Sequence, residues 1–304
     1  MRKLLVIVFC VLVGCGQDPA SKPDPAANNG GGKPLVFTVN YPLAWMAEQL
    51  AGASATVVLP APADVDPAYW QPDIATLLQF QQADLVLLNG AGYAKWLAGA
   101  SLPASRLVDT SLAYRDQLLV VDSAPVHSHG PQGDHSHGDL AFTTWLDLQL
   151  AQQQASVVAQ ALQRLLPEES AAIDLRLATL QKVLADLDAR LLALGAKLDG
   201  APLLYSHPVY QYLQRRYRLS GEALHWEPDQ TPDDTQWLEL AKILRDHPAQ
   251  FMLWEEQPLP AVAARLAQLG INVVVFTPLA NRPKQGDFSA NMEANVQALE
   301  AALN

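Results

Sequence analysis

The sequence predicts an α/β protein with two lobes, each built on a mainly parallel sheet flanked by helices, joined by one long spine helix. Short apolar runs stop abruptly at polar or turn residues, and helical patterns follow them. Such runs are typical of strands buried on both faces of a parallel sheet. The pattern recurs in both halves of a chain of 304 residues, which is too long for one typical domain.

Six apolar runs are expected to be strands. Those of the first half end at Asn40, Pro60 and Asn89, residues that favour turns. Helical patterns separate the runs, and alternation of strands with helices indicates parallel pairing. The six runs cover residues 35–39, 55–59, 85–88, 203–205, 251–254 and 273–276.

The spine helix is expected over residues 167–199. Pro167 and Glu168 suit its first turn, and Asp199 with Gly200 suits its end. At 1.5 Å per residue, about 30 residues make a helix about 45 Å long, enough to run along both lobes. The apolar stripe would equally suit a coiled-coil dimer. Its members recur at alternating spacings of four and three and are Ile173, Leu177, Leu180, Leu184, Leu187, Leu191, Leu194 and Leu198.

The N-terminus has the order of a lipoprotein signal peptide over residues 1–14. Arg2 and Lys3 precede an apolar run over residues 4–13, and Cys15 follows in the position where a lipoprotein signal peptidase leaves the new N-terminus. We therefore expect a lipid on Cys15 that holds the protein on the periplasmic side of a bacterial membrane. A transmembrane anchor is the alternative, but spanning a bilayer takes about 20 apolar residues.

The remaining domain boundaries follow from these elements. Residues 15–33 are rich in Pro, Gly, Asn and Ala, which predicts a flexible tether. The N-terminal lobe is expected over 34–166, the spine helix over 167–199 and the C-terminal lobe over 200–304.

Composition and missing motifs exclude several classes of protein. The net charge of −11 argues against nucleic-acid binding, which needs a basic surface. Cys10 lies in the predicted signal peptide and Cys15 at the predicted lipid site, so no thiol remains for a disulfide, a thiolate metal site or a nucleophile. The sequence also lacks a nucleophile elbow, a phosphate-binding Gly loop and a His-Glu-x-x-His helix. No enzymatic activity is expected.

A Gly-rich loop over residues 127–137 concentrates four of the seven histidines. Neutral imidazole is a common ligand of zinc and related ions. The loop is not preorganised, so we expect moderate affinity and fast exchange. The alternative is a solvated loop without a metal. The four histidines are His127, His129, His135 and His137.

Two side chains follow predicted strands of the second half directly. Ligands of parallel α/β sheets bind outside the carboxyl ends of the strands. His207 comes after the run 203–205, and Glu255, with Glu256 beside it, comes after the run 251–254. One of these glutamates could bind a cation or orient His207, although both could also be surface charges.

The Pro-rich segment 60–72 is expected to overhang the same cleft. Asp64 and Asp66 supply carboxylates there, and Tyr69 and Trp70 supply aromatic walls suited to an ion or a small polar ligand. A Trp that packs under the loop is an equally good interpretation. The segment 225–229 is similar in kind but less well positioned.

The chain from residue 34 to 304 resembles the zinc/manganese substrate-binding proteins of ABC importers. The lipoprotein signal, the histidine-rich loop and the long central helix occur in the order of that family. Short motifs carry the same order: Val39-Asn40-Tyr41-Pro42, Ala83-Asp84-Leu85-Val86, Trp145-Leu146-Asp147 and His207-Pro208-Val209-Tyr210. The resemblance implies two α/β lobes and an ion held between them by three histidines and a carboxylate.

This chain departs from the ligand set that the resemblance implies. His207 is retained, but Ala68 and Thr143 stand where two histidines are expected, and Thr277 stands where an aspartate is typical. Neutral oxygens or a methyl group are poor substitutes for imidazole. Zinc held by His207, Glu255, Asp66 and water is one possibility. A chelated metal or a small organic ligand in the cleft is another, and a principal ion site in the histidine loop is a third.

The resulting hypothesis is a lipid-anchored binding protein that captures zinc, or another divalent metal, and presents it to an ABC permease. Zinc would be the transported ligand, and the cleft would be lined by Trp70, Tyr69, Thr143 and Thr277. A periplasmic metal buffer or chaperone without a permease is the alternative. A metal-dependent hydrolase is disfavoured, since it would need three protein ligands around an open position.

Overall fold

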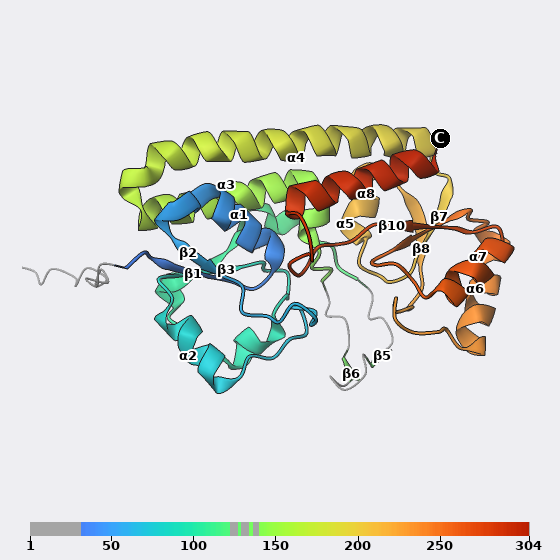
Figure 1. Cartoon of the computed structure of the whole chain (residues 1–304), viewed down its shortest axis with the longest axis horizontal. Helices are drawn as coiled ribbons and strands as arrows, with labels where there is room; N and C mark the ends of the chain where they lie inside the picture. Colours follow the sequence, from blue (N-terminus) through green and yellow to red (C-terminus); the bar gives the residue numbers. More distant parts are fainter. Residues whose placement is uncertain (1–31, 122–126, 129–133, 136–139, 304) are drawn as a thin grey trace, which may run out of the picture. The chain divides into compact units, whose positions relative to one another are not determined.

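The computed structural model describes residues 32–121, 127–128, 134–135 and 140–303 (Figure 1). Residues from 33 onward form one compact unit. Among the described residues, no helix has the length and apolar character needed to cross a membrane. The predicted lipid site at Cys15 lies outside the described residues, as do His129 and His137.

The N-terminal half contains a parallel four-stranded sheet in the order β2-β1-β3-β4. Asn40 caps the helix α1 by accepting a hydrogen bond from the backbone N–H of Leu43 at 3.2 Å. The strands are β1 (Leu35–Thr38), β2 (Thr56–Val58), β3 (Leu85–Leu88) and β4 (Leu107–Asp109). The α-helices are α1 (Tyr41–Ala51), α2 (Ile74–Gln82) and α3 (Leu148–Leu165). Short 3-10 helices are η1 (Gly52–Ser54), η2 (Lys95–Gly99), η3 (Ala104–Arg106), η4 (Thr110–Gln117) and η6 (Thr144–Leu146).

The C-terminal half contains a second parallel sheet in the order β10-β9-β7-β8. Its strands are β7 (Pro202–Tyr205), β8 (Ser220–Ala223), β9 (Phe251–Trp254) and β10 (Asn272–Val275). Its helices are α5 (Gln211–Tyr217), α6 (Asp234–Asp246), α7 (Pro260–Gln268) and α8 (Phe288–Ala302). Two parallel sheets flanked by helices confirm the predicted fold class.

Two strands of the four-stranded sheets, β4 and β8, lie outside the six that the sequence predicts. Each occupies a sheet edge and is only partly buried. β4 ends in Asp109, and β8 contains Ser220 and Glu222, so neither has the continuous apolar run by which the other strands are identified. The strand β8, which the sequence did not predict, matters for the functional site because a polar loop follows it.

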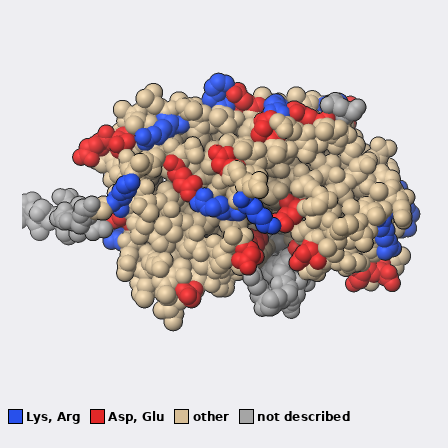
Figure 2. All heavy atoms as spheres, in the orientation of Figure 1, with Lys and Arg blue, Asp and Glu red and all other residues tan. Residues whose placement is uncertain are grey.

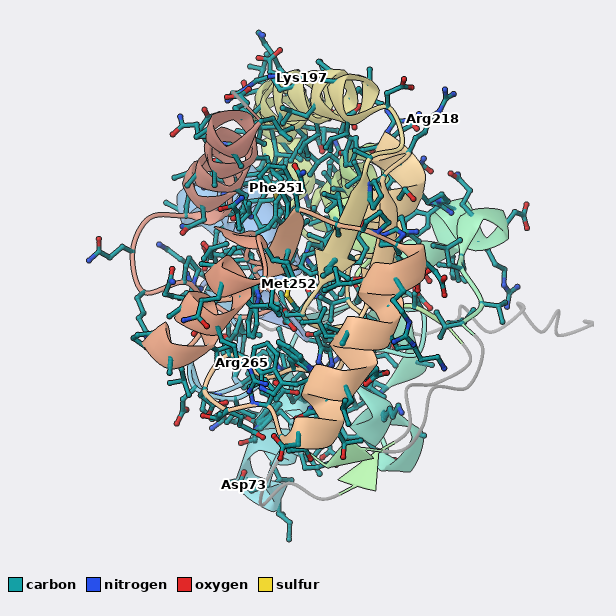
Figure 3. The ribbon with its side chains drawn as sticks, turned by 90° about the vertical axis from the view of Figure 1, so that its right-hand side faces the viewer. Asp73, Lys197, Arg218, Phe251, Met252 and Arg265 are labelled. Atoms are coloured by element: carbon teal, nitrogen blue, oxygen red, sulfur yellow. The ribbon has the colours of Figure 1, made fainter. Side chains whose placement is uncertain are left out.

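The two faces of the C-terminal sheet are covered by different helices. Phe251 and Met252, neighbours on β9, lie on opposite sides of the sheet (Figure 3). Phe251 packs against the large core that includes residues of α4 and α8, whereas Met252 belongs to a smaller core with Trp226 and Trp237. The Arg265 guanidinium closes that smaller core, 4.0 Å from the centre of the Trp237 ring.

The predicted spine helix is α4 (Ser170–Leu198), preceded by the 3-10 turn η7 (Pro167–Glu169). It contacts α1 and α3 of the first half and α5 and α8 of the second (Figure 1). The apolar stripe is buried within this chain, except that Leu177 is partly exposed. The stripe that would also suit a coiled-coil dimer is thus covered by the chain's own helices.

Gly195 allows α4 to approach the end of α5 closely. An ideal Cβ at this position would lie 2.0 Å from the carbonyl oxygen of Tyr217. We expect Gly195→Ala to lower the free energy of unfolding by about 1–3 kcal/mol, the usual cost of forcing a methyl group into a packed interior. Gly99→Ala is the matched control, because nothing lies within 4 Å of its ideal Cβ. Urea denaturation measures both, and equal stability of the two variants would contradict the prediction.

Candidate functional site

The carboxyl ends of β7, β8 and β9 bring five polar side chains to one edge of the C-terminal sheet. Ser206 and His207 follow β7, His225 and Glu227 follow β8, and Glu255 follows β9. Because β7 lies between β9 and β8, these three loops are neighbours. The placement of His207 and Glu255 at strand ends agrees with the prediction.

The side chain of His207 is almost fully buried at this edge. Its relative exposure is 4%, and its Nδ1 lies 3.5 Å from Glu227 Oε1. The rings of His207 and His225 are 5.8 Å apart between centroids and nearly perpendicular, at 85°. His225 and Glu227 are partly exposed, so the group opens toward solvent on that side.

Glu255 is influenced by three other carboxylates, which come from both halves of the chain. Burial, together with the negative charges of Asp66, Glu227 and Glu256, raises the pKa of Glu255 to about 8. Part of Glu255 remains accessible, but its carboxyl group loses hydration among surrounding protein atoms. Glu256 is exposed, so Glu255 is the member of the pair that faces the protein interior.

Tyr69 places the N-terminal segment beside this cluster. Burial raises its pKa, and the charges of Asp66, Glu255 and Glu227 raise it further. Its ring lies edge-on to Phe142, 6.2 Å between centroids. Asp66 and Tyr69, predicted to overhang the cleft, therefore lie near the carboxylates of the C-terminal half.

Other predicted residues lie away from this cluster or are occupied by structural contacts. Trp70 packs edge-on against Trp96, 6.4 Å between ring centroids, which favours the interpretation of a Trp under a loop. Asp64 is exposed. The backbones of His127 and His135 pair directly across the antiparallel strands β5 (His127–Ser128) and β6 (Asp134–His135).

No three His, Cys, Asp or Glu side chains in the described part of the chain stand close enough together to hold a metal ion. The face drawn in Figure 2 carries charged side chains of both signs across its middle, so the net negative charge is not gathered into one acidic surface there. An ion that binds beside His207 must therefore draw neighbouring side chains toward itself.

The sequence of residues 36–302 matches the family described as zinc-uptake complex component A, periplasmic, or ZnuA. The chain belongs to the ZnuA family. This confirms the resemblance found in the sequence, and it identifies the chain as a metal-binding transport protein and not an enzyme. The order of motifs along the chain was therefore a better guide to the family than the composition of the cleft.

Individual relatives agree with the family match. The chain is 24% identical over 319 residues to the high-affinity zinc uptake system protein ZnuA of Bacillus subtilis, covering 99% of this chain and 97% of the relative. It is 23% identical over 280 residues to the zinc-binding lipoprotein AdcA of Streptococcus pneumoniae, covering 88% of this chain and 56% of AdcA.

Solved structures show the same fold. The metal-dependent lipoprotein YcdH of Bacillus subtilis superposes with a TM-score of 0.75 at 21% identity, covering 88% of this chain and 98% of YcdH. The periplasmic zinc-binding protein TroA of Treponema pallidum superposes with a TM-score of 0.69 at 19% identity, covering 90% and 99% of the two chains. The two-lobed architecture with a long connecting helix is thus that of the ZnuA family.

The positions at which this ZnuA-family chain departs from the expected ligands are used to hold the structure together. Ala68 is buried. The Thr143 hydroxyl donates to the Val209 carbonyl at 2.5 Å, a contact between the two halves. Thr277 exchanges two hydrogen bonds with the Asn295 side chain, through its N–H at 3.0 Å and its carbonyl at 2.8 Å. Thr143 and Thr277 therefore have structural contacts in addition to their predicted place along the cleft.

His225 and Glu227 are the residues near the site that sequence reasoning undervalued. Both follow β8, whose short and partly polar sequence carries no strand signal. The useful signal was the segment 225–229 itself, which combines an imidazole, an indole and two carboxylates. Only the pairing of β8 with β7 brings that segment beside His207.

Proposed function

We propose that this chain is a lipid-anchored, extracytoplasmic binding protein that captures zinc, or a related divalent metal, for an ABC permease. Membership of the ZnuA family supports the transport role, and the names of the relatives support zinc as the ligand. The signal-peptide pattern that ends at Cys15 supports the lipid anchor. Zinc is the cargo in this proposal and not a resident cofactor.

The observation that carries the proposal is that the charges of Asp66 and Glu227 act on Glu255, while Glu227 lies 3.5 Å from the buried imidazole of His207. Mutual repulsion and lost hydration hold a proton on Glu255, whose pKa is about 8. A divalent cation can take the place of that proton and cancel the repulsion. Zinc accepts both imidazole nitrogen and carboxylate oxygen, so His207 with Glu255 and Asp66 forms a chemically suitable set.

The histidine loop has a separate role in this proposal. His127, His129, His135 and His137 would gather ions at the surface, while the cluster at His207 would retain one ion for delivery. Near-complete burial of the α4 stripe on helices of both halves predicts small relative movement of the lobes, because a packed spine resists wide hinge closure.

The test is a zinc titration by calorimetry on the full chain in detergent, with residues 127–137 either intact or replaced by a Gly-Ser linker. We expect the loop-replaced chain to bind one zinc ion. His207→Ala in that chain should weaken binding at least tenfold, since even a residue that only supports a metal ligand is worth about 10–100-fold in affinity.

His247→Ala is the matched control for the removal of an imidazole. His247 Nε2 is hydrogen-bonded to the Leu203 carbonyl at 2.8 Å, away from the carboxyl end of β7, so its loss should leave zinc affinity unchanged. If the loop-replaced chain takes up no zinc while the intact chain does, metal capture belongs to the loop and the cleft serves another ligand.

A further inference from the structure

We infer that the loop after β8 supplies ligands of the cargo ion: His225 as a second imidazole beside His207, with Glu227 orienting His207. This inference rests on the proposed function and specifies where the ion is held. It shifts the site from the junction of the lobes to the C-terminal sheet edge, where both imidazoles and Glu227 follow neighbouring strands β7 and β8.

The separation of the two rings suits one shared ion. A zinc–nitrogen bond is about 2.0–2.1 Å, so two imidazoles on one tetrahedral ion have ring centroids roughly 5 Å apart. The centroids of His207 and His225 are 5.8 Å apart, with the rings at 85°. The observed centroid separation is therefore within about 1 Å of that expected for a shared ion, and the rings would have to adjust to bind it, which agrees with the absence of a ready three-ligand group among the described residues.

Glu227 has the position of a supporting carboxylate. Its Oε1 lies 3.5 Å from His207 Nδ1, and a metal-bound histidine commonly donates its other ring nitrogen to a carboxylate, which orients the ring and increases its basicity. We assign Nδ1 of His207 to Glu227 and Nε2 to the ion. The carboxylate of Glu255, on which the charge of Glu227 acts, is our candidate for an oxygen ligand.

Outside the histidine loop, the N-terminal half has no histidine that could complete the family's usual arrangement. Ala68 carries no donor, and the Thr143 hydroxyl donates to Val209. Outside the histidine loop, the histidines of the chain are His207, His225 and His247. Since His247 is bonded to the Leu203 carbonyl, the nitrogen donors near the cleft in the described residues come from the loops after β7 and β8.

One buried hydroxyl group provides independent support for a ligand at this place. Ser206, directly before His207, is fully buried, and its Oγ has no hydrogen-bond partner among the described residues. Buried polar atoms without partners are uncommon and mark sites where water or a ligand binds.

The kind of metal ion that this site binds follows from its donor atoms. Two imidazoles with a carboxylate favour zinc, cobalt, nickel or copper, whereas magnesium, calcium and manganese prefer sites made of oxygen. We therefore expect zinc and cobalt(II) to bind the loop-replaced chain and magnesium at millimolar concentration not to compete.

The test compares His225→Gln, Glu227→Gln and Asp229→Asn in the full chain with residues 127–137 replaced. Cobalt(II) absorption reports imidazole coordination, and competition with a zinc-chelating dye gives the affinity. We expect at least a tenfold loss of zinc affinity and a changed cobalt spectrum for His225→Gln, and a tenfold or greater loss for Glu227→Gln. Asp229 is exposed, so Asp229→Asn should match the parent. Unchanged metal-free thermal unfolding confirms that the variants fold.

The outcomes separate this inference from the proposed function. If His207→Ala loses zinc while His225→Gln retains the parent's affinity and spectrum, the protein binds zinc in the cleft but His225 is not a ligand, and the inference is wrong. If the loop-replaced parent binds no zinc, the cleft site fails together with the inference. Similar losses of zinc affinity in His207→Ala and His225→Gln support both the proposed function and the inference about His225.

Discussion

Replacing Trp145 with alanine should lower the free energy of unfolding by about 3–5 kcal/mol, the usual cost of truncating a fully buried Trp. Trp145 lies on η6, before α3, and is 0% exposed. Its indole Nε1 donates to the Pro278 carbonyl at 2.6 Å, and its ring contacts Tyr93 edge-on, 5.9 Å between centroids. The substitution therefore leaves a cavity between the two halves and an unsatisfied carbonyl group.

Urea denaturation and thermal unfolding of the metal-free protein measure this effect. In a protein of this size, each kcal/mol corresponds to about 2–4 °C, so the midpoint should fall by roughly 10 °C. Trp70→Ala is the control, because Trp70 is partly exposed and contacts Trp96 only at its edge. Comparable losses for both variants would show that Trp145 does not hold the halves together.

The second large effect is a dependence of stability on pH that disappears in Glu255→Gln. The pKa of Glu255 is raised from 4.5 to about 8 in the folded protein. Between these values the folded chain keeps a proton that the unfolded chain has lost, so the free energy of unfolding falls as pH rises from about 4.5 to 8. Each pKa unit corresponds to about 1.4 kcal/mol, so the full effect is several kcal/mol.

Denaturation at a series of pH values separates Glu255 from the other titrating groups. Glu255→Gln should be more stable than the parent at pH 9, and the difference should vanish below pH 4.5, where the carboxyl is protonated in both states. Glu256→Gln serves as the control, since Glu256 is exposed and should change the profile little. A constant difference between the parent and Glu255→Gln at every pH would contradict this assignment.

Central strands, the long helix and the strand-end positions of His207 and Glu255 could be predicted from the sequence. Strands β1, β3, β7 and β9 are buried in the middle of their sheets, so their apolar runs are continuous. The apolar stripe of α4 could be predicted equally well, because burial along one helix face imposes a regular spacing of apolar residues on the sequence.

The cluster beside His207 could be predicted only in part. Asp66 and Glu255 were expected at the cleft, but the roles of Glu227 and His225 depend on the pairing of β8 with β7. That pairing is decided by contacts between residues far apart in the chain, and β8 itself has too little apolar character to reveal it.

The sequence by itself determined the fold class and the family, because burial periodicity and motif order can be read along the chain. Tertiary structure alone decided that Thr143 bonds to Val209 across the two halves, that Asp66 comes near Glu255 and Glu227, and that His225 faces His207. The physical reason is that mutual distance and lost hydration set the chemistry of these side chains, and both depend on how separate segments pack together.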